Sequence, residues 1–319
     1  MADQGGLRGV LPYDASSSVL EIVGAVDPSV VSISQFRDGN TAGFFQALAE
    51  SDVLLHVLEP VTAEVMDQAR RLRLVHKIGV GLDAVDLDYA KRRGIAVCNM
   101  PGTNTPAVAE FALTLMLSCL RRIVPFSNDV SRGGGWPARN ENLGRLGEIA
   151  GRTVGLVGYG AVAQRLSKIL AAMGAKVVAY DPFLSSADVP LLDLDSLVEQ
   201  SDIISLHVPL TSETANLFNK ARLGRMKRGS ILVNTARGPL VDELALEEKL
   251  RAGDIAAAGL DVAVEEPPRP DHPLRSLQNV VMTPHLAWLT DETWRRSVDV
   301  IVENCRRLKA GSPLLHRVA

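Results

Sequence analysis

Cysteine is scarce in this sequence. Three residues, Cys98, Cys119 and Cys305, are spread over 319 positions with no C-x-x-C pair. That spacing fits neither a disulfide framework nor a zinc site, so we expect buried free thiols and no metal site.

The sequence also lacks a strong charge and a long apolar run. Its net charge is −3 with 22% charged residues, which gives no electrostatic reason to expect nucleic acid or an acidic membrane as a partner. No run of about 18 apolar residues occurs, and the N-terminal residues do not resemble a signal peptide. We therefore expect a cytoplasmic protein. A length of 319 residues with 46% apolar side chains fits two domains of ordinary size.

The second half of the chain alternates short apolar runs with helical patterns. One helical pattern covers 161–174, and another covers 242–253 and ends at Gly253. Continuous apolar strands between helices predict a parallel sheet covered on both faces, here a Rossmann-type doubly wound sheet. The expected strands are 153–158, 176–181, 202–208, 230–235, 255–262 and 279–283.

The first hundred residues repeat this alternation on a smaller scale, which predicts a flavodoxin-like α/β domain. An apolar helix at 107–122 follows, and then a glycine-rich stretch without periodicity at 130–148. The last helix, 291–311, has no strand after it, so we expect it to return to the first domain. The expected strands of that domain are 8–13, 29–34, 52–57, 74–79 and 95–99, with helices near 15–25, 41–50, 62–71 and 86–93.

A glycine motif lies between the first strand and the first helix of the second half. Gly158, Gly160 and Ala163 form G-x-G-x-x-A, which permits a tight turn, close approach of a pyrophosphate and close helix–strand packing. Asp181 ends the next strand, roughly 20 residues later, where an acid binds ribose hydroxyls. No arginine follows it to accommodate a 2′-phosphate. The motif therefore predicts a dinucleotide site with NAD favoured over NADP.

Polar side chains follow three later strands of the same sheet. Arg237 ends "NTAR", Asp261 and Glu266 lie in "GLDVAVEEP", and His285 ends "TPH". Taken singly, the arginine fits a surface salt bridge, the glutamate a solvated loop acid and the histidine a turn residue. Together they would lie outside the carboxyl edge of one parallel sheet, where ligands bind.

These motifs resemble the D-isomer-specific 2-hydroxyacid dehydrogenase family, which includes phosphoglycerate dehydrogenases and glyoxylate/hydroxypyruvate reductases. The similarity runs from "KIGVGLDAVDLDYAKRRGIAVCNMPGTNTPAVAEFAL" (77–113) through the glycine loop, "NTARGPLVDE", "GLDVAVEEPP" and "TPHLAW". The resemblance implies a discontinuous substrate domain, 1–102 with 289–319, and an NAD-binding domain, 103–288. It also implies a homodimer built on the helix 107–122 and the segment after it.

The resemblance implies Arg237, Glu266 and His285 as the catalytic set. His285 would give a proton to the carbonyl oxygen of a 2-oxo acid, and Glu266 would keep the imidazolium protonated near neutrality. Arg237 would bind the substrate carboxylate with its planar fork. The family places the nicotinamide carboxamide at Asp261, and backbone N–H groups around Val80 and Gly81 at the carboxylate. The expected NAD contacts are Val80, Gly158, Gly160, Ala161, Val162, Asp181, Val208, Pro209, Thr235, Ala236, Arg237, Asp261, His285 and Ala287.

Some positions depart from the phosphoglycerate pattern. Trp288 in "HLAW" is similar to the C-terminal-binding-protein-like branch, where it lines the substrate pocket, although packing between domains is an equal alternative. His56 and Leu58 stand where phosphoglycerate enzymes carry a phosphate-binding arginine, which argues against 3-phosphoglycerate. Ala161 replaces an arginine of many relatives, so one pyrophosphate contact is absent. Formate dehydrogenases have glutamine at the position of Glu266, which argues against that activity.

We therefore expect an NAD-dependent oxidoreductase that interconverts a 2-oxo acid and its D-2-hydroxy acid. A regulatory or scaffold protein that senses NAD is the alternative from another class, as the C-terminal-binding-protein resemblance allows. The Arg237, Glu266 and His285 set and the lack of low-complexity tails favour the enzyme. A dehydrogenase of an unusual acid, such as a phosphonate, is a third alternative.

Overall fold

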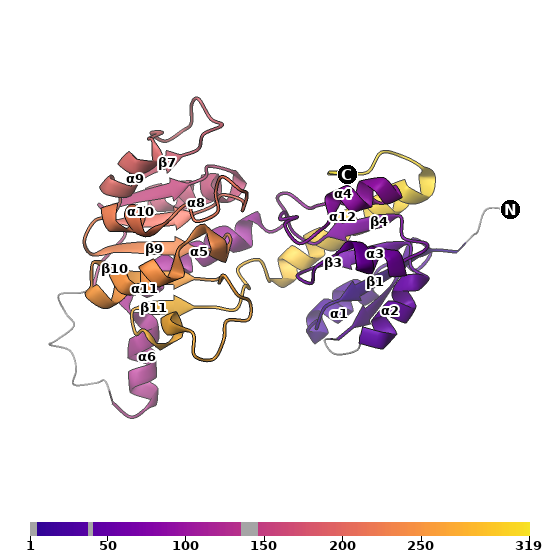
Figure 1. Cartoon of the computed structure of the whole chain (residues 1–319), viewed down its shortest axis with the longest axis horizontal. Helices are drawn as coiled ribbons and strands as arrows, with labels where there is room; N and C mark the ends of the chain where they lie inside the picture. Colours follow the sequence, from indigo (N-terminus) through magenta and orange to yellow (C-terminus); the bar gives the residue numbers. More distant parts are fainter. Residues whose placement is uncertain (1–4, 38–40, 135–145) are drawn as a thin grey trace. The chain divides into compact units, whose positions relative to one another are not determined.

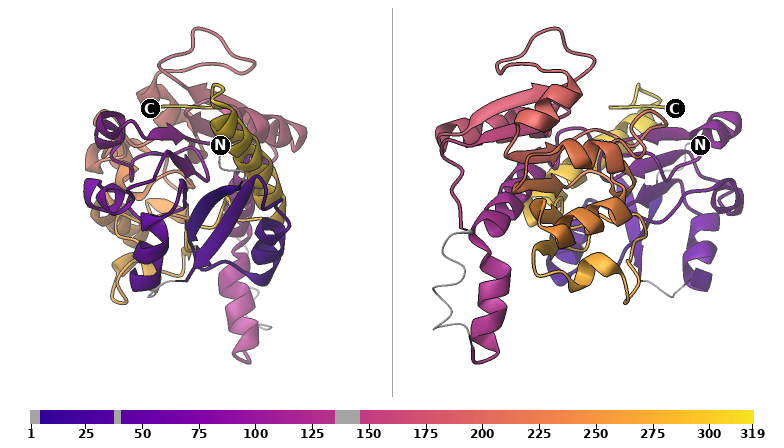
Figure 2. Two further views of the ribbon diagram at one scale, coloured as in Figure 1. Left: turned by 90° about the vertical axis from the view of Figure 1, so that its right-hand side faces the viewer. Right: turned by 60° about the vertical axis from the view of Figure 1, so that its left-hand side comes forward.

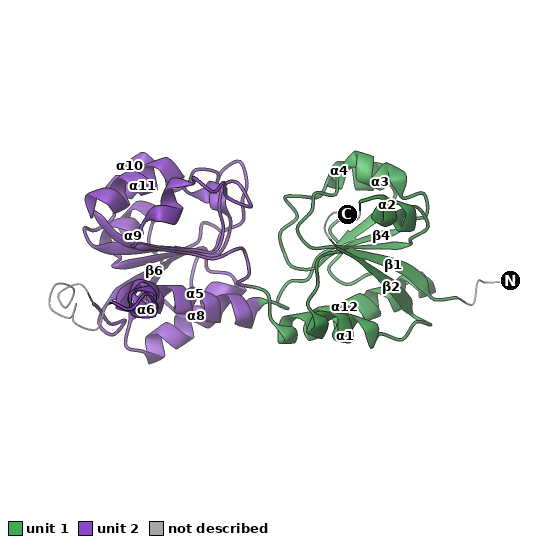
Figure 3. Cartoon of the chain, turned by 90° about the horizontal axis from the view of Figure 1, so that it is seen from below, with its two compact units in different colours: residues 1–104, 288–319 green, residues 105–287 purple. Residues whose placement is uncertain are grey.

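The chain folds into two compact units (Figure 3). The computed structural model describes residues 5–37, 41–134 and 146–319. Unit 1 comprises Met1–Asn104 and Trp288–Ala319, and unit 2 comprises Thr105–Ala287. The divisions expected from the sequence, near residues 102 and 288, lie close to these limits.

Unit 1 contains a five-stranded parallel sheet in the order β2-β1-β3-β4-β5. Helices α1 and α12 cover one face of this sheet, and α2, α3 and α4 cover the other (Figure 3). The strands are β1 (Leu7–Pro12), β2 (Val31–Phe36), β3 (Val53–His56), β4 (Leu74–Lys77) and β5 (Ala96–Cys98). The helices are α1 (Ser17–Gly24), α2 (Thr41–Ala49), α3 (Ala63–Gln68), α4 (Leu87–Arg93) and α12 (Asp291–Ala310).

Helix α12 returns the end of the chain to unit 1, as the missing final strand predicts. Thr290 caps its first turn by accepting a hydrogen bond from the Thr293 N–H, and Gly311 ends it in the left-handed region with φ 64°. Its buried face includes Trp294 and Ile301. Burial of this face, rather than helix propensity alone, holds α12 on the sheet.

Unit 2 contains a six-stranded parallel sheet in the order β11-β10-β9-β8-β6-β7 (Figure 1). Its strands are β6 (Thr153–Val157), β7 (Lys176–Tyr180), β8 (Ile203–Leu206), β9 (Ser230–Asn234), β10 (Ile255–Leu260) and β11 (Val280–Met282). Its helices are α5 (Thr105–Arg121), α6 (Ile123–Ser131), α8 (Ala161–Ala172), α9 (Leu194–Gln200), α10 (Lys220–Arg225) and α11 (Glu243–Ala252), with 3₁₀ turns η2 (Gly238–Leu240) and η3 (Pro273–Ser276).

The six-stranded sheet reverses its direction of winding between β6 and β8, which are neighbours in the sheet. In open α/β sheets, ligands bind beyond the carboxyl ends of the strands at such a switch point. The glycine motif follows β6, and Val208 and Pro209 follow β8. The strand order therefore places the predicted dinucleotide motif at the switch point of unit 2.

The predicted helix at 107–122 corresponds to α5, and a second helix that was not predicted, α6, follows it. Helix α5 ends at Arg121, and Arg122, with a left-handed φ of 51°, begins α6. Helix α6 extends away from the six-stranded sheet in Figure 2, and none of its residues is buried. Of the glycine-rich stretch at 130–148, residues 135–145 lie outside the described residues.

All three cysteines are buried free thiols, as predicted. Burial raises the pKa of the Cys98 thiol to about 11 and those of Cys119 and Cys305 to about 12. Of the helices described in the three resolved ranges, none is long and apolar enough to cross a membrane.

Candidate active site

Three neighbouring strands of unit 2 carry the predicted catalytic side chains on the loops that follow them. Strands β9, β10 and β11 are adjacent in the sheet and parallel, so their carboxyl ends share one edge. Arg237 follows β9, Glu266 follows β10 and His285 follows β11. Parallel pairing thus gathers residues that are up to 48 positions apart in the chain, from 237 to 285.

His285 and Glu266 form a close pair. The Nδ1 atom of His285 lies 2.7 Å from Oε2 of Glu266, and the other carboxylate oxygen accepts a hydrogen bond from the Ala263 N–H at 3.0 Å. Burial raises the pKa of Glu266, but the hydrogen bond and charge of His285, the Ala263 N–H and the Arg237 charge outweigh it, so this pKa is lowered overall. The pair therefore favours an ionised Glu266.

The turn that carries His285 is strained and is held by Asp261. His285 has a left-handed φ of 53°, unusual for a residue with a side chain. Its N–H donates to the Asp261 carbonyl at 2.8 Å, and the Asp261 carboxylate accepts from the N–H groups of Leu286 and Ala287 at 3.0 and 2.8 Å. Thr283 Oγ1 donates to the same carboxylate at 2.7 Å. Asp261 therefore fixes the turn, a role that the sequence analysis did not identify.

Asp261 is 1% exposed, and burial raises the pKa of its carboxyl group although its hydrogen bonds and His285 oppose the shift. Three donors to the carboxylate explain why burial of this carboxyl group is tolerated. The sequence signal for this turn-fixing role was an acidic residue directly after the apolar strand β10.

The backbone around Arg237 is fixed by the side chain of Asn234. The side-chain amide of Asn234 donates to the Arg237 carbonyl at 2.8 Å, and its oxygen accepts from the Ala236 N–H at 3.0 Å. The guanidinium donates from Nη1 to the Ala236 carbonyl at 2.7 Å. Asn234 is 1% exposed. Asn234 was not among the residues predicted from the sequence, although an amide at the end of an apolar strand is a signal for such a contact.

The glycine motif forms a backbone turn that is open to a ligand. Gly158 has φ 89°, and a Cβ atom there would lie 2.8 Å from the backbone of His207, so a larger residue would strain the turn and clash. A Cβ at Gly160 would meet nothing within 4 Å. Gly160 caps α8 without a side-chain hydrogen bond, so the first N–H groups of α8 remain available to an anion.

Asp181 lies directly beyond β7 and binds the glycine turn. Its carboxylate accepts hydrogen bonds from the N–H groups of Tyr159 at 2.9 Å and Phe183 at 3.0 Å, and lone pairs remain for ribose hydroxyls. Thr235, beyond β9, has a buried hydroxyl that makes no hydrogen bond with the described protein atoms. The open Gly160 backbone, this hydroxyl and the acid at Asp181 fit a dinucleotide.

In unit 1 the predicted carboxylate-binding turn follows β4. Gly79 has φ 124°, and its carbonyl accepts from the Met100 N–H at 2.8 Å. The Asn99 side chain donates to the Val80 carbonyl at 3.0 Å. Val80 is 48% exposed, so this turn lies at the surface of unit 1.

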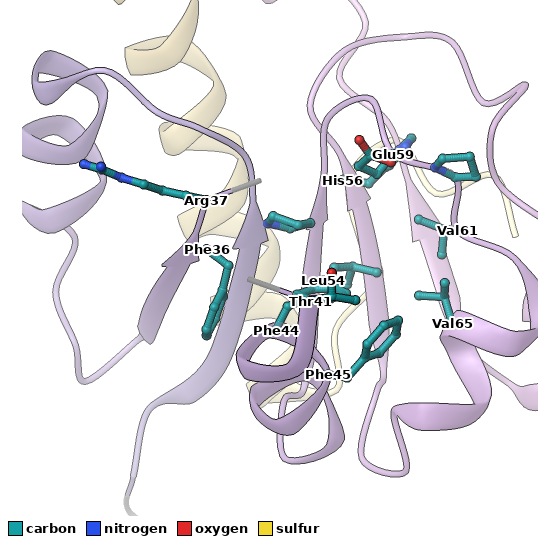
Figure 4. A pocket seen from close by; sticks show the side chains of 12 residues that line it. Phe36, Arg37, Thr41, Phe44, Phe45, Leu54, His56, Glu59, Val61 and Val65 are labelled. Atoms are coloured by element: carbon teal, nitrogen blue, oxygen red, sulfur yellow. The ribbon is translucent and has the colours of Figure 1, made fainter. Parts of the chain in front are cut away.

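His56, Leu58 and Trp288 do not share one surface within unit 1. Trp288 is 9% exposed and packs against Tyr13 and Trp294 with ring centroids 6.1 and 5.7 Å away, which places it with α12. His56 is 1% exposed and lines a cavity of about 320 Å³ with residues of α2, which covers the opposite face of the sheet (Figures 3 and 4). Leu58 is 46% exposed on the loop after β3.

The His56 imidazole is neutral. Burial, followed by the charge of Lys77, lowers its pKa to about 3. Both ring nitrogens are buried without a hydrogen-bond partner in the described structure. A neutral, buried imidazole cannot supply the positive charge that a phosphate requires.

The chain belongs to the D-isomer specific 2-hydroxyacid dehydrogenase family. The model of that family's NAD binding domain matches residues 113–287, which lie entirely within unit 2. The chain therefore carries an NAD-binding domain of this family, and the Rossmann-type fold expected from the sequence is confirmed.

Two curated relatives have similar identity but different coverage. A hydroxypyruvate reductase from Thermotoga maritima is 42% identical over 261 residues, 80% of this chain and 84% of that protein. A D-3-phosphoglycerate dehydrogenase from Archaeoglobus fulgidus is 42% identical over 263 residues, 81% of this chain but 49% of that protein. The chain thus spans about half the length of the phosphoglycerate dehydrogenase that it matches.

The fold is also similar to that of a solved relative with bound cofactor. An NAD-dependent formate dehydrogenase from Staphylococcus aureus, in complex with NAD, has a TM-score of 0.88 and 29% identity. The similarity covers 98% of this chain and 99% of that one.

Proposed function

We propose that this protein is an NAD-dependent oxidoreductase that interconverts a 2-oxo acid and its D-2-hydroxy acid. The observation that carries the proposal is the His285–Glu266 pair, with 2.7 Å between Nδ1 and Oε2, at the sheet edge that also carries Arg237. Family membership and the NAD-binding domain support it.

His285 is the proton donor to the carbonyl oxygen in reduction and the base in oxidation. Because Nδ1 faces Glu266, Nε2 is the nitrogen left to give and take the substrate proton. The negative charge of Glu266 stabilises the imidazolium, which extends proton donation toward higher pH. Asp261 holds the strained turn, so the ring has little freedom to leave this geometry.

Arg237 binds the substrate carboxylate and polarises the carbonyl group. A guanidinium is charged at every relevant pH and offers a planar pair of donors, which matches a carboxylate. Its bond to the Ala236 carbonyl and the Asn234 contacts restrict the orientation of the loop. We assign the N–H groups of Val80 and Gly81 to the same carboxylate.

When bound, NADH supplies the hydride that the carbonyl carbon receives. Gly158, Gly160 and the first N–H groups of α8, at Ala161 and Val162, would hold its pyrophosphate. Asp181 would hold the ribose hydroxyls and repel a 2′-phosphate. The further contacts that we assign are Val208, Pro209, Thr235, Ala236, Asp261 and Ala287.

The substrate carries no phosphate. His56 is buried and neutral, and Leu58 is an exposed apolar side chain, so neither position offers a cation. Hydroxypyruvate, or a larger 2-oxo acid with an uncharged side chain, fits these residues better than a phosphorylated 2-oxo acid.

We also propose a homodimer in which α5 and α6 meet the partner. Ile123, Val124 and Val130 of α6 are 56%, 38% and 49% exposed, and no residue of that helix is buried in the monomer. Exposed apolar side chains gathered on one helix mark a surface for protein association. A sedimentation experiment that finds only monomers would contradict this part.

A screen of NADH consumption over 2-oxo acids of graded size and charge tests the function. Glyoxylate, pyruvate, hydroxypyruvate, 4-methyl-2-oxopentanoate and 3-phosphohydroxypyruvate form a suitable set. We expect turnover of at least one unphosphorylated acid, lost by more than a hundredfold in His285→Ala. NADH binding without turnover of any acid would instead indicate an NAD-sensing protein. Oxidation of a phosphonate with NAD⁺, followed as NADH formation, would indicate the third alternative.

A further inference from the structure

Unit 2 contains a second carboxylate–histidine pair beside the loop that carries Glu266. The Oε2 atom of Glu243 lies 3.1 Å from Nε2 of His272, and its Oε1 accepts a hydrogen bond from the Val264 N–H at 3.0 Å. Val264 precedes Glu266 by two positions in the same loop. One carboxylate thus joins two segments of the loop that begins after β10.

This pair is mostly buried and stands on a rigid base. The side chains of Glu243 and His272 are 15% and 11% exposed, against 35% for Glu266. Glu243 is the first residue of α11, whose N-cap Asp242 accepts from the Ala245 N–H at 3.0 Å. His272 directly precedes η3, whose Leu274 belongs to the core. A buried carboxylate is costly unless it is hydrogen-bonded, so both contacts are needed to keep it there.

Gly238 fixes the same loop from the other side. A Cβ atom at Gly238 would lie 2.0 Å from the carbonyl group of Ala263 and 2.4 Å from the Val264 nitrogen. The backbone at 263–264 therefore lies directly against the residue that follows Arg237. The Ala263 N–H in turn donates to Glu266.

We propose that Glu243 and His272 are positioning residues that hold the 263–266 loop so that the Glu266 carboxylate meets His285. The proposal rests on the function proposed above, and it adds two residues that touch neither substrate nor cofactor. The Glu243 carboxylate fixes Val264, Gly238 limits the movement of Ala263, and Ala263 orients Glu266.

Loss of this contact changes an electrostatic pair as well as local stability. Without the Glu243 acceptor, the Val264 N–H loses its partner and the loop gains freedom, so Glu266 spends less time at 2.7 Å from His285. Arg237 and Asp261 are the other charged groups near this pair, and both stay in place. Glu265 and Arg269 pair with each other at 3.4 Å on the exposed side of the loop.

Glu243→Ala and Glu243→Gln test the proposal together. Alanine removes the acceptor, whereas glutamine retains an oxygen for the Val264 N–H and an amide that can donate to His272. We expect Glu243→Ala to lower the titration midpoint of the His285 ring, followed by NMR, by about half a pH unit or more, because its anionic partner is displaced. We expect kcat/KM for reduction to fall about tenfold with NADH affinity changed less than twofold, and glutamine to restore both readouts.

Glu248→Ala is the matched control. Glu248 lies on the same helix and pairs only with Lys220 among the described residues, at 2.7 Å, with 61% of its side chain exposed. Its removal should leave the His285 titration unchanged. His285→Asn identifies the ring signal that is followed.

An unchanged His285 midpoint in a folded Glu243→Ala variant overturns the proposal, and so does failure of glutamine to restore it. If the alanine variant does not fold, amide exchange in the wild type decides. The Val264 N–H should then exchange at least about tenfold more slowly than an unprotected amide, and an unprotected Val264 overturns the proposal. The NMR readouts need no turnover, so a wild type that reduces no 2-oxo acid contradicts the proposed function alone.

Discussion

Replacement of Glu266 by glutamine is expected to lower the upper pH limit of the reduction reaction by about one unit. Reduction requires a protonated His285, and the Glu266 charge stabilises that form across a distance of 2.7 Å between the nearest atoms. Glutamine removes the charge, so the imidazolium loses its proton at a lower pH. The lower pH limit of the oxidation reaction should fall in parallel, because oxidation requires the neutral ring.

The size of this shift follows from Coulomb's law with solvent screening. Two unit charges with centres roughly 4 Å apart interact by about 1 kcal/mol in water and about 4 kcal/mol at an effective dielectric constant near 20. The side chains of His285 and Glu266 are 21% and 35% exposed, so solvent screens the pair. The lower end of this range of interaction energies therefore applies. One pH unit corresponds to about 1.4 kcal/mol, which gives a shift of about one unit.

Glutamine also changes the hydrogen bonds, so the pH dependence and not the rate alone must be compared. Glu266 accepts from both His285 and Ala263, whereas an amide has a single acceptor oxygen. A fall in kcat at every pH would therefore follow from lost geometry. The assay measures kcat/KM for NADH-dependent reduction from pH 5 to 10 in the wild type and in the variant.

Glu265→Gln is the matched control, because Glu265 is adjacent in sequence, 61% exposed, and paired with Arg269 instead of His285. It should leave the profile in place. Equal profiles for the wild type and Glu266→Gln would refute the assignment of Glu266 as the charge partner.

Three further predictions follow from the described contacts. Asp181→Ala should weaken the binding of NADH relative to that of NADPH by roughly tenfold, because the acid that binds the ribose hydroxyls and repels a 2′-phosphate is lost. KM values for both cofactors measure this change, and a wild type that prefers NADPH would contradict the prediction. Trp288→Ala should lower the free energy of unfolding by about 3–5 kcal/mol, because its ring packs against Tyr13 and Trp294. If the free energy of unfolding were unchanged and kcat/KM fell only for bulky substrates, Trp288 would line the substrate pocket instead. His76 is buried and His207 is half-buried with a buried Nε2, and burial lowers the pKa of each ring to about 4. The unfolded chain therefore binds protons that the folded chain does not, and stability present above about pH 6.5 should be lost as the pH falls toward 4, by up to about 1.4 kcal/mol per unit for each ring. Denaturant unfolding at pH 7 and pH 5 measures this loss, and His76→Asn should reduce it.

Local patterns in the sequence predicted much of the fold because each depends on neighbouring residues. The apolar runs at 153–158 and 176–181 contain the observed β6 and β7, and Gly253 ends α11 in the left-handed region with φ 73°. The glycine motif predicted the turn at Gly158. Glycine is required there because φ is positive and the contact with His207 leaves no space for a side chain. Helix α6, which begins after Arg122, was not predicted, because the left-handed φ at Arg122 that redirects the chain arises from the tertiary fold.

The catalytic residue types, their place at strand ends and, through the family resemblance, the pairing of Glu266 with His285 came from the sequence, but the geometry of the pair did not. Which oxygen of Glu266 faces His285 depends on the path of a loop held by Glu243 and Gly238. His56 and Trp288 show the same limit. Both occur in family motifs near a predicted site, yet His56 packs with α2 and Trp288 with α12, because strand alternation and chain return place them on different faces. Contacts between residues distant in the chain are set by packing, and only the tertiary structure decides them.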